Sequence, residues 1–384
     1  MHIVLVTPYY APEYKFGGPI RKIASLARHL TRRGHEVSVV TLHSERPRAH
    51  DRALIDGVAV QHLSWIGSGQ RQFPTGTAEL RKCIGEADVV HLFGLYNFIC
   101  PIAAKYARWH AVPFFIEPMG MAIPRVRSFR AKRVYNHLFT RHLFKNAAAV
   151  IATSQLEANE IHGWYSSVNV VVRRNGIEIP PGCGANRHRI RAEWGVREND
   201  LLIGYIGRIS ANKGLVNLVR AFERMRNART KLLIAGPVSD ASSTELQSAI
   251  RASPRRAEIT FRGPLFGQEH AAILTALDVF VLPSESENFG NAAGEAVAAG
   301  VPVLVTRQCG IAPIIDQQFG IAVDQGVENL RRGLEEMLQP ETRKRWNFDR
   351  EKVEAALGWD EPVNEMLALY ETAVSQSRKR KVER

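Results

Sequence analysis

Residues 278–305 read DVFVLPSESENFGNAAGEAVAAGVPVLV, and this stretch decides the fold. The apolar run Asp278–Leu282 predicts a buried strand, and the Ala-rich stretch after Asn291 predicts a helix. Val301–Val305 then predicts a second buried strand. A strand, a crossover helix and a further strand form a βαβ unit, which is the building block of a parallel sheet.

The same alternation runs along the whole chain and predicts an α/β protein. Other apolar strands are expected at His2–Thr7, Glu36–Leu42, Val58–Leu63, Ala87–Leu92, Pro113–Glu117, Ala147–Thr153, Leu201–Tyr205, Lys231–Ala235 and Glu258–Arg262. Such a pattern is typical of a doubly wound parallel sheet with helices on both faces. Because 384 residues exceed one ordinary domain, we predict two Rossmann-like domains, residues 1–174 and 185–358, with a turn-rich linker over 175–184.

Two glutamates, Glu287 and Glu295, lie eight positions apart across the predicted turn and helix. Gly290 and Gly294 let the backbone approach a ligand, and a helix N-terminus offers free N–H groups to anionic oxygens. Glutamates at this spacing also occur as solvated charge on many helices. The surrounding Ser-Glu-Asn-Phe-Gly and Gly-Glu-Ala-Val-Ala-Ala-Gly are rarer. The whole stretch resembles the Glu-x7-Glu signature of retaining GT-B glycosyltransferases of family 4.

A second motif follows the strand that opens the second half. Residues 203–214 read IGYIGRISANKG and place Arg208 and Lys213 in a Gly-rich turn before a helix. A guanidinium can fork onto phosphate oxygens, and an ammonium adds a compact charge. The pattern alone is also compatible with a surface turn. In this position it resembles the Gly-Arg…Lys-Gly diphosphate motif of the same family.

The resemblance covers essentially the whole chain and implies the GT-B fold, two Rossmann-like domains facing across a cleft. Glu287, Arg208 and Lys213 are the implied catalytic residues, with Glu287 at the donor sugar and both cations at the diphosphate. Glu295 is implied to accept hydrogen bonds from the nucleotide ribose. The remaining implied donor-binding residues are Asn288, Phe289, Gly290, Asn291, Gly207 and Gly263.

The same resemblance implies a nucleotide-diphosphate sugar, such as a UDP- or GDP-sugar, as donor. No Asp-x-Asp metal motif occurs in the sequence. Arg208 and Lys213 can instead stabilise the leaving diphosphate, so we expect no metal. Retention without a protein nucleophile is implied by the family, with the diphosphate taking the acceptor proton. Catalysis then consists of positioning and electrostatics.

The first half is expected to bind the acceptor. Gly17 and Gly18 resemble the glycine loop of the family, which approaches the donor phosphates and the acceptor. His91 ends one strand and Glu117 another. Each is a candidate acceptor contact, but a buried histidine and an ordinary strand-end charge remain alternatives. Met119 stands where many family members carry His or Arg, so the histidine of that motif has no counterpart here.

Positive charge is concentrated in the first half. Residues 1–174 hold 23 Lys and Arg against 11 Asp and Glu, whereas residues 175–384 hold 28 against 27. The segment Pro124–Lys145 combines basic with apolar residues, which is typical of a helix lying on an anionic membrane. Apolar positions facing the core, with solvated arginines, are the alternative. No nucleic-acid module is recognisable, so a nucleic-acid partner is not expected.

Several absences shape the expected location. The N-terminus enters a strand at once, without the pattern of a signal peptide, and no apolar stretch is long enough to cross a membrane. Four scattered cysteines suggest neither zinc nor disulfides and fit a reducing cytoplasm. An amphipathic helix over 359–375 resembles the GT-B helix that returns to the first domain, followed by a tail expected to be disordered.

Together these features predict a hexosyltransferase-type glycosyltransferase of bacterial polysaccharide synthesis, forming exopolysaccharide, capsule or O-antigen. Its expected acceptor is a saccharide or a polyprenyl-diphosphate-linked saccharide. The expected location is cytoplasmic, peripheral on the inner face of the membrane. The alternatives are a GT-B nucleotide-sugar isomerase or epimerase and a non-catalytic basic membrane-binding protein.

Overall fold

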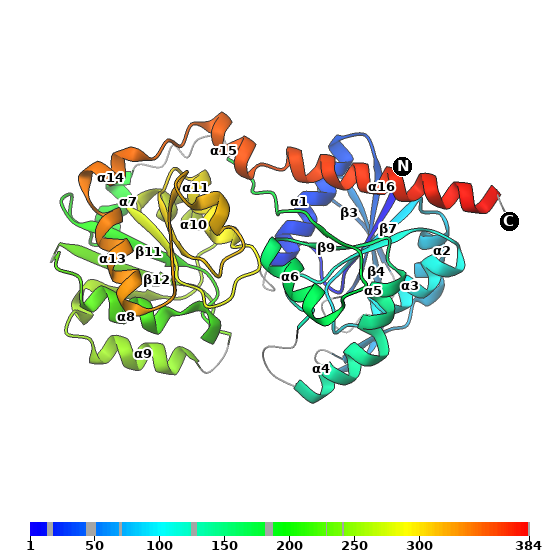
Figure 1. Cartoon of the computed structure of the whole chain (residues 1–384), viewed down its shortest axis with the longest axis horizontal. Coiled ribbons are helices and arrows are strands. Elements are labelled where there is room, and N and C mark those ends of the chain that lie inside the picture. Colours follow the sequence, from blue (N-terminus) through cyan, green and yellow to red (C-terminus); the bar gives the residue numbers. More distant parts are fainter. Residues whose placement is uncertain are drawn as a thin grey trace. The chain divides into compact units, whose positions relative to one another are not determined.

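The structure is a computed structural model that describes residues 1–13, 18–43, 51–68, 71–123, 129–180, 187–227, 229–239 and 242–382. The chain divides into two compact units. The first unit is Met1–Gly176 with Trp359–Arg384, and the second unit is Ile177–Gly358. Each unit is an α/β sandwich around its own sheet, as Figure 1 shows.

The first unit is built on an eight-stranded sheet of order β10-β9-β8-β7-β1-β2-β4-β3. Its pairings are parallel except for the antiparallel edge pair β3–β4. Its strands are β1 His2–Val6, β2 Glu36–Leu42, β3 Asp51–Ile55, β4 Val58–Leu63, β7 Val89–Phe93, β8 Phe114–Glu117, β9 Ala149–Ala152 and β10 Val170–Val172, with a separate hairpin of β5 Trp65–Ser68 and β6 Arg71–Pro74. Its helices are α1 Gly18–Arg32, α2 Thr77–Gly85, α3 Ile99–Trp109, α4 Phe129–Tyr135, the π-helical η2 Asn136–Thr140, α5 Arg141–Asn146, α6 Gln155–Trp164 and α16 Asp360–Val382.

Alternating side chains of the first sheet enter two separate cores. On β1, Val4 and Val6 belong to the core that contains residues of α2, α3 and α6. Ile3 and Leu5 face the other core, together with residues of α1 and α16. Burial on both faces explains why the strands are almost continuously apolar, as parallel strands covered by helices are.

The C-terminal helix α16 belongs to the first unit and extends beyond the predicted amphipathic stretch. The residues expected to form a disordered tail continue the helix to Val382. Ser377 donates a hydrogen bond to the Ala111 carbonyl at 2.8 Å, and Arg378 pairs with Asp88 at 2.8 Å. These anchors order the helix where composition alone indicated disorder.

The second unit is built on a six-stranded, fully parallel sheet of order β13-β12-β11-β14-β15-β16. Its strands are β11 Leu201–Ile206, β12 Thr230–Ala235, β13 Ile259–Arg262, β14 Val279–Leu282, β15 Val303–Thr306 and β16 Gly320–Val323. Its helices are α7 Arg187–Glu193, α8 Leu215–Glu223, α9 Ser242–Ala252, α10 Gly267–Ala276, α11 Asn291–Ala298, α12 Ala312–Ile315, α13 Val327–Met337, α14 Pro340–Arg345 and α15 Arg350–Leu357, with 3-10 turns η3 Ala211–Lys213 and η4 Arg256–Glu258. The predicted class, two Rossmann-like parallel-sheet domains, is confirmed.

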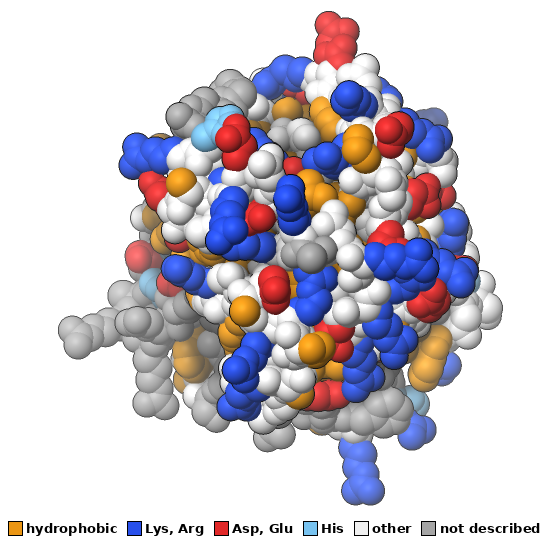
Figure 2. Space-filling view, turned by 90° about the vertical axis from the view of Figure 1, so that its left-hand side faces the viewer, with side chains coloured by type: hydrophobic (Ala, Val, Ile, Leu, Met, Phe, Trp, Pro, Cys, Tyr) orange, Lys and Arg blue, Asp and Glu red, His pale blue; other side chains and the backbone are white. Residues whose placement is uncertain are grey.

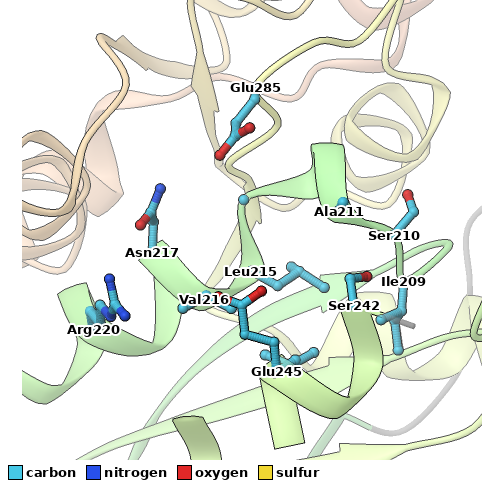
Figure 3. A pocket seen from close by; sticks show the side chains of 12 residues that line it. Ile209, Ser210, Ala211, Leu215, Val216, Asn217, Arg220, Ser242, Glu245 and Glu285 are labelled. Carbon is cyan, nitrogen blue, oxygen red and sulfur yellow. The ribbon is translucent and has the colours of Figure 1, made fainter. Parts of the chain in front are cut away.

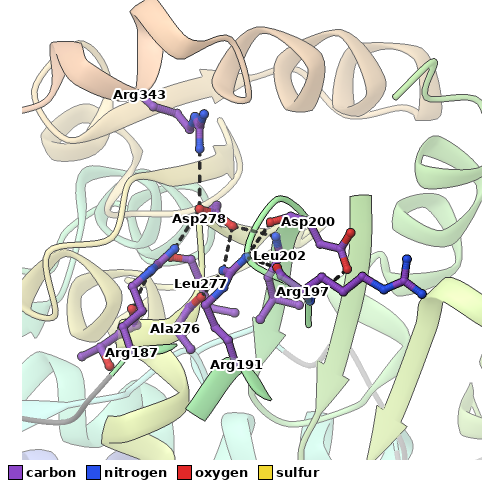
Figure 4. A network of polar contacts seen from close by, with 10 residues as sticks. Arg187, Arg191, Arg197, Asp200, Leu202, Ala276, Leu277, Asp278 and Arg343 are labelled. Carbon is purple, nitrogen blue, oxygen red and sulfur yellow. Dashed lines mark hydrogen bonds and ion pairs between the residues drawn. The ribbon is translucent and has the colours of Figure 1, made fainter. Parts of the chain in front are cut away.

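A cluster of charged side chains lies at the amino ends of β11 and β14. Asp278 accepts hydrogen bonds from Arg187 at 2.8 Å, from Arg191 at 3.0 Å and from the Leu202 N–H at 2.7 Å (Figure 4). Arg343 lies 3.6 Å from the same carboxylate. Asp278 joins α7 and α14 to the sheet, so side-chain contacts fix its amino edge. Loops follow the strands at the opposite, carboxyl edge.

Candidate active site

The two motifs of the second unit meet at the carboxyl edge of its sheet. β11 ends at Ile206, directly before Gly207 and Arg208, and β14 ends at Leu282, before the loop that holds Glu287. β11 and β14 are hydrogen-bonded neighbours. Loops at the carboxyl ends of parallel strands are where such sheets bind ligands. The chain order therefore brings residues about 75 positions apart into one place.

Lys213 and Glu287 form an ion pair at this edge. Their side chains are 15 % and 22 % exposed, so solvent reaches both. The Glu287 backbone is fixed on both sides, since its N–H donates to the Gln308 carbonyl at 3.1 Å and its own carbonyl accepts from Gly310 at 3.0 Å. The carboxylate is thus held on a fixed loop, and the ammonium reaches it from the loop that follows β11.

Arg208 is exposed beside this pair. Its carbonyl accepts a 2.6 Å hydrogen bond from the Tyr205 hydroxyl, which fixes the backbone but leaves the side chain free to reach outward. Burial raises the pKa of Tyr205, Glu287 raises it further, and Arg208 lowers it. Arg208 and Lys213 lie on the same loop after β11, and β11 is the neighbour of β14, the strand that precedes Glu287.

Glu295 lies one turn into α11, which begins directly after Gly290. Its carboxylate is 33 % exposed and lies 3.6 Å from the His270 imidazole on α10. Gly290 has a φ of 111°, and a Cβ there would lie 3.0 Å from Ile311 and Leu282. The left-handed turn that starts the helix therefore needs glycine. His270 was not singled out by the sequence, because it lies on a different helix.

The other predicted donor residues differ in their exposure. Phe289 is only 2 % exposed and packs in the core, with its carbonyl accepting from Ile311 at 2.7 Å. The Asn288 amide nitrogen is buried and has no hydrogen-bond partner among the described residues. Asn291 begins α11, and Gly263 follows β13 with open space where a Cβ would stand.

One glycine that the sequence analysis missed stands beside Gly207. Gly236 follows β12, and a Cβ there would lie 1.8 Å from the Gly207 carbonyl oxygen. The loops after β11 and β12 therefore touch backbone to backbone. A glycine directly after a predicted strand was the available signal.

A pocket of about 160 Å³ adjoins the loop of residues 207–214, which carries Arg208 and Lys213 (Figure 3). Ser210, Gly214 and Glu285 line one side of it, and residues of α8 and α9 line the other. None of the four charged residues predicted at the donor site lines this pocket. The pocket is therefore separate from the predicted donor-site charges.

The candidate acceptor residues of the first unit are buried. His91 on β7 and Glu117 at the end of β8 are both fully buried. His91 shares a 2.6 Å hydrogen bond with the Tyr370 hydroxyl of α16. Glu117 pairs with Lys22 of α1 and accepts from Arg173 at 2.6 Å. Both predicted acceptor contacts are thus occupied inside the protein, and we do not retain them as ligand-binding residues.

The turn after β8 is nearer to the surface. Met119 is half-buried and has a φ of 51°, an uncommon value for a residue other than glycine. Gly120 donates to Glu157 at 2.7 Å, which holds the turn. Gly18 begins α1 and is exposed, whereas Gly17 lies outside the described residues. Strained turns of this kind occur often at functional sites.

The basic segment of the first unit exposes apolar side chains. Val134 on α4 and Leu138 on η2 are each 58 % exposed, beside the exposed Arg130. Arg125 and Arg127 of the same segment lie outside the described residues. In contrast, the face in Figure 2, on the side of α13 and α14, intersperses acidic and basic side chains.

Among the described residues, no group of three or more His, Cys, Asp or Glu side chains could hold a metal ion. No helix in the described part of the chain is long and apolar enough to cross a membrane.

Comparison with known proteins matches each unit separately. Residues 186–352 match the family model "Glycosyl transferases group 1", and residues 17–176 match "Glycosyl transferase 4-like domain". D-inositol 3-phosphate glycosyltransferase of Mycobacteroides abscessus is 25 % identical over 94 % of this chain and 86 % of its own length. GDP-mannose:cellobiosyl-diphosphopolyprenol alpha-mannosyltransferase of Xanthomonas campestris is 26 % identical over 79 % and 78 %.

Solved structures share the fold. Sucrose-phosphate synthase of Thermosynechococcus elongatus superposes with a TM-score of 0.74 at 19 % identity, over 98 % of this chain and 99 % of that one. Anabaena HepE in complex with UDP and glucose gives a TM-score of 0.75 at 16 % identity, over 97 % and 100 %. Together the two family models match most of both units and include both motifs, so the chain belongs to the group 1 glycosyltransferases and is a glycosyltransferase.

Proposed function

We propose that this glycosyltransferase moves a sugar from a nucleotide-diphosphate sugar to a saccharide or lipid-linked saccharide, with retention, in bacterial polysaccharide synthesis. The observation that carries the proposal is the Lys213–Glu287 pair beside the exposed Arg208, at the carboxyl edge of the second sheet. Two cations next to one carboxylate fit a donor in which a diphosphate adjoins a sugar.

The proposed step needs no nucleophile from the protein. The bond between the anomeric carbon and the diphosphate oxygen breaks while the acceptor oxygen bonds to that carbon on the same face. The acceptor hydroxyl gives its proton to the departing diphosphate oxygen. Arg208 and Lys213 stabilise the charge that develops on the diphosphate, and Glu287 holds the sugar. The charge stabilisation comes from side chains, so the step as proposed uses no metal.

The two units are proposed to divide the work. Residues 185–358 would bind the donor, with Glu295 accepting hydrogen bonds from the ribose hydroxyls. Residues 1–174 would bind the acceptor through the Met119–Gly120 turn and the glycine loop that leads into α1. The half-exposed Met119 supports this assignment, whereas the buried His91 and Glu117 serve the structure of the unit.

The acceptor is proposed to be lipid-linked and reached at the inner face of the cell membrane. One relative is named for a cellobiosyl-diphosphopolyprenol acceptor. Val134 and Leu138 expose apolar surface next to Arg130 in the basic unit. Apolar side chains that enter the interface, together with arginines at anionic headgroups, are the features of a peripheral membrane helix. A cytoplasmic location is part of the same proposal.

The donor assignment is tested with Arg208→Ala and Glu295→Ala. Purified variants are assayed for hydrolysis and transfer across a panel of UDP-, GDP- and ADP-sugars. Both should lose about 100-fold or more in kcat/KM with an unchanged melting temperature, as when a charge-stabilising group is removed. Arg220→Ala, an exposed arginine on α8, is the matched control. Normal turnover in both variants refutes the donor site, and conversion of the donor into an isomer without an acceptor refutes transfer.

The membrane assignment is tested with the double variant Val134→Glu/Leu138→Glu. Its binding to vesicles containing an anionic lipid should fall at least about ten-fold, because apolar insertion is replaced by repulsion. Leu54→Glu is the control, since Leu54 is 76 % exposed on β3 of the same unit but lies outside the basic segment. Equal binding by both variants would contradict the proposal that Val134 and Leu138 belong to a membrane-binding surface.

A further inference from the structure

The loop that carries Lys213 is attached to the loop that carries Glu287 at successive residues. A Cβ on Gly214, whose φ is 62°, would lie 2.1 Å from the Pro283 carbonyl oxygen. The Glu285 N–H donates to the Asn212 carbonyl at 2.8 Å. The Lys213–Glu287 ion pair follows. The two loops therefore run against each other through backbone contacts as well as through the charged pair.

The Asn212 side chain adds a bridge between the same loops. Its Nδ2 donates to the Ser286 carbonyl at 3.0 Å, and its Oδ1 accepts from the Ser210 hydroxyl at 2.7 Å. An amide can accept through its oxygen and donate through its nitrogen without carrying charge. Asn212 thus joins its own loop to the residue directly before Glu287, at the position directly before Lys213.

Packing does not replace these hydrogen bonds. The pocket of about 160 Å³ adjoins this loop and is lined by Ser210, Gly214 and Glu285, and the side chains of Ser210 and Glu285 are labelled in Figure 3. A loop with a cavity on one side is not held by close-packed neighbours on that side. Its position therefore depends on its polar contacts.

We propose that Asn212 is a positioning residue for transfer, which sets the distance between the Lys213 ammonium and the Glu287 carboxylate. The inference depends on the proposed donor site. A bound diphosphate competes for the Lys213 ammonium and weakens its pairing with Glu287. Once that pairing is weakened, Asn212 keeps the two loops in register. The diphosphate and the sugar of one donor are then held at a fixed separation. Holding the reacting groups in a fixed geometry raises the reaction rate, as it does in intramolecular reactions.

The test compares Asn212→Ala with Asn217→Ala. Asn217 is also half-buried and lies on α8, where it lines the pocket. Asn212→Ala should lower kcat for donor turnover about ten-fold, the size expected for two ordinary hydrogen bonds. Its Kd for UDP, GDP or ADP, whichever the wild type binds tightest, should change less than about three-fold. A merely structural role would lower the melting temperature and leave kcat per folded molecule unchanged, which would overturn the inference.

Two further comparisons make the test independent of folding. Ser210→Ala, which removes the hydroxyl that orients the amide, should lower kcat about three-fold, and Ser210→Thr should restore it. In a Lys213→Ala background, Asn212→Ala should have little further effect, because it acts through Lys213. Additive losses would contradict that coupling.

The failure of the inference and the failure of the proposed function give different results. If Lys213→Ala itself turns over donor normally, the donor site is wrong. If Lys213→Ala is impaired while Asn212→Ala behaves as Asn217→Ala does, the donor site stands and only the role of Asn212 is rejected.

Discussion

Each unit carries a Lys–Glu pair near the carboxyl end of a parallel strand, and the two pairs differ in burial. The side chains of Lys22 and Glu117 are 4 % and 0 % exposed. Those of Lys213 and Glu287 are 15 % and 22 % exposed. Desolvated charges depend on each other, because a buried ion without its partner is costly. Solvated charges can exchange partners for a ligand. The same two residue types thus serve structure in one unit and are available for chemistry in the other.

The largest expected effect comes from removing the buried carboxylate. Glu117→Gln should lower the free energy of unfolding by about 3–5 kcal/mol, because it leaves the Lys22 ammonium and the Arg173 guanidinium without the carboxylate that contacts both. Glu287→Gln, its counterpart in the second unit, should change that free energy by less than about 1 kcal/mol. Urea denaturation of both variants gives the comparison. Equal losses would mean that burial does not separate the two pairs.

The next effect is on the rate and not on stability. Lys213→Met should slow sugar transfer by about 10²–10³-fold, since in the proposed mechanism it removes a cation that stabilises the leaving diphosphate. Unfolding should be almost unaffected, as for other exposed ion pairs. Lys231→Met is the control, because Lys231 lies near the amino end of β12, where it contacts the Gly195 carbonyl. A slow Lys231→Met enzyme would mean that any lost lysine impairs this unit.

The sequence predicts the Lys213–Glu287 pair better than the Lys22–Glu117 pair, because the two pairs differ in the elements that carry them. Lys213 and Glu287 follow two strands that the pattern identified, and their meeting requires only that β11 and β14 be neighbours. Lys22 follows Arg21 at the start of an amphipathic helix, where a lysine normally faces water. Its contact with Glu117 joins residues 95 positions apart and depends on how α1 packs. Neither periodicity nor spacing carries that information.

The same distinction holds for the strands. β2 and β4 were predicted to the residue, because long apolar runs leave little choice of secondary structure. β3 was missed, since most of its residues are exposed and Leu54 faces solvent at the antiparallel edge. β10 is three residues long. Short edge strands form because a neighbouring strand offers hydrogen bonds, which is a property of the sheet and not of the segment.

A smaller effect is expected from the close approach of the two second-unit loops. Gly214→Ala and Gly195→Ala both place alanine at a left-handed φ, of 62° and 65° respectively. Only the first meets an obstacle, the Pro283 carbonyl oxygen at 2.1 Å, whereas no atom lies within 4 Å of a Cβ at Gly195. Gly214→Ala should therefore cost about 1–3 kcal/mol more in stability. It should also slow transfer, because the Lys213 loop must shift. Equal costs in the two variants would show that the loops separate freely.

The smallest expected effect is on the pH dependence of the free energy of unfolding. It arises from His91, which is buried in the first unit. Burial lowers the pKa of His91 well below 6.5, and Arg173 and Lys22 lower it further. Glu117 lies 3.9 Å away and favours the charged form, but it does not outweigh desolvation. Above pH 6.5 the imidazole is neutral in both the folded and the unfolded chain, so it contributes no pH dependence. Below pH 6.5 the unfolded chain takes up a proton that the folded chain refuses, and stability falls as the pH falls, by at most about 1.4 kcal/mol per pH unit.

The slope of the free energy of unfolding against pH therefore distinguishes a histidine that stays neutral in the folded chain from one that binds a proton there. The free energy of unfolding, measured by urea denaturation between pH 7.5 and 5.5, should decline less steeply in His91→Gln than in the wild type. The matched control is His188→Gln, which removes an exposed imidazole of the second unit and should leave the slope unchanged. If His91→Gln kept the wild-type slope, His91 would bind a proton in the folded chain. The contrast between the buried charges of the first unit and the solvated charges of the second unit would then not extend to His91.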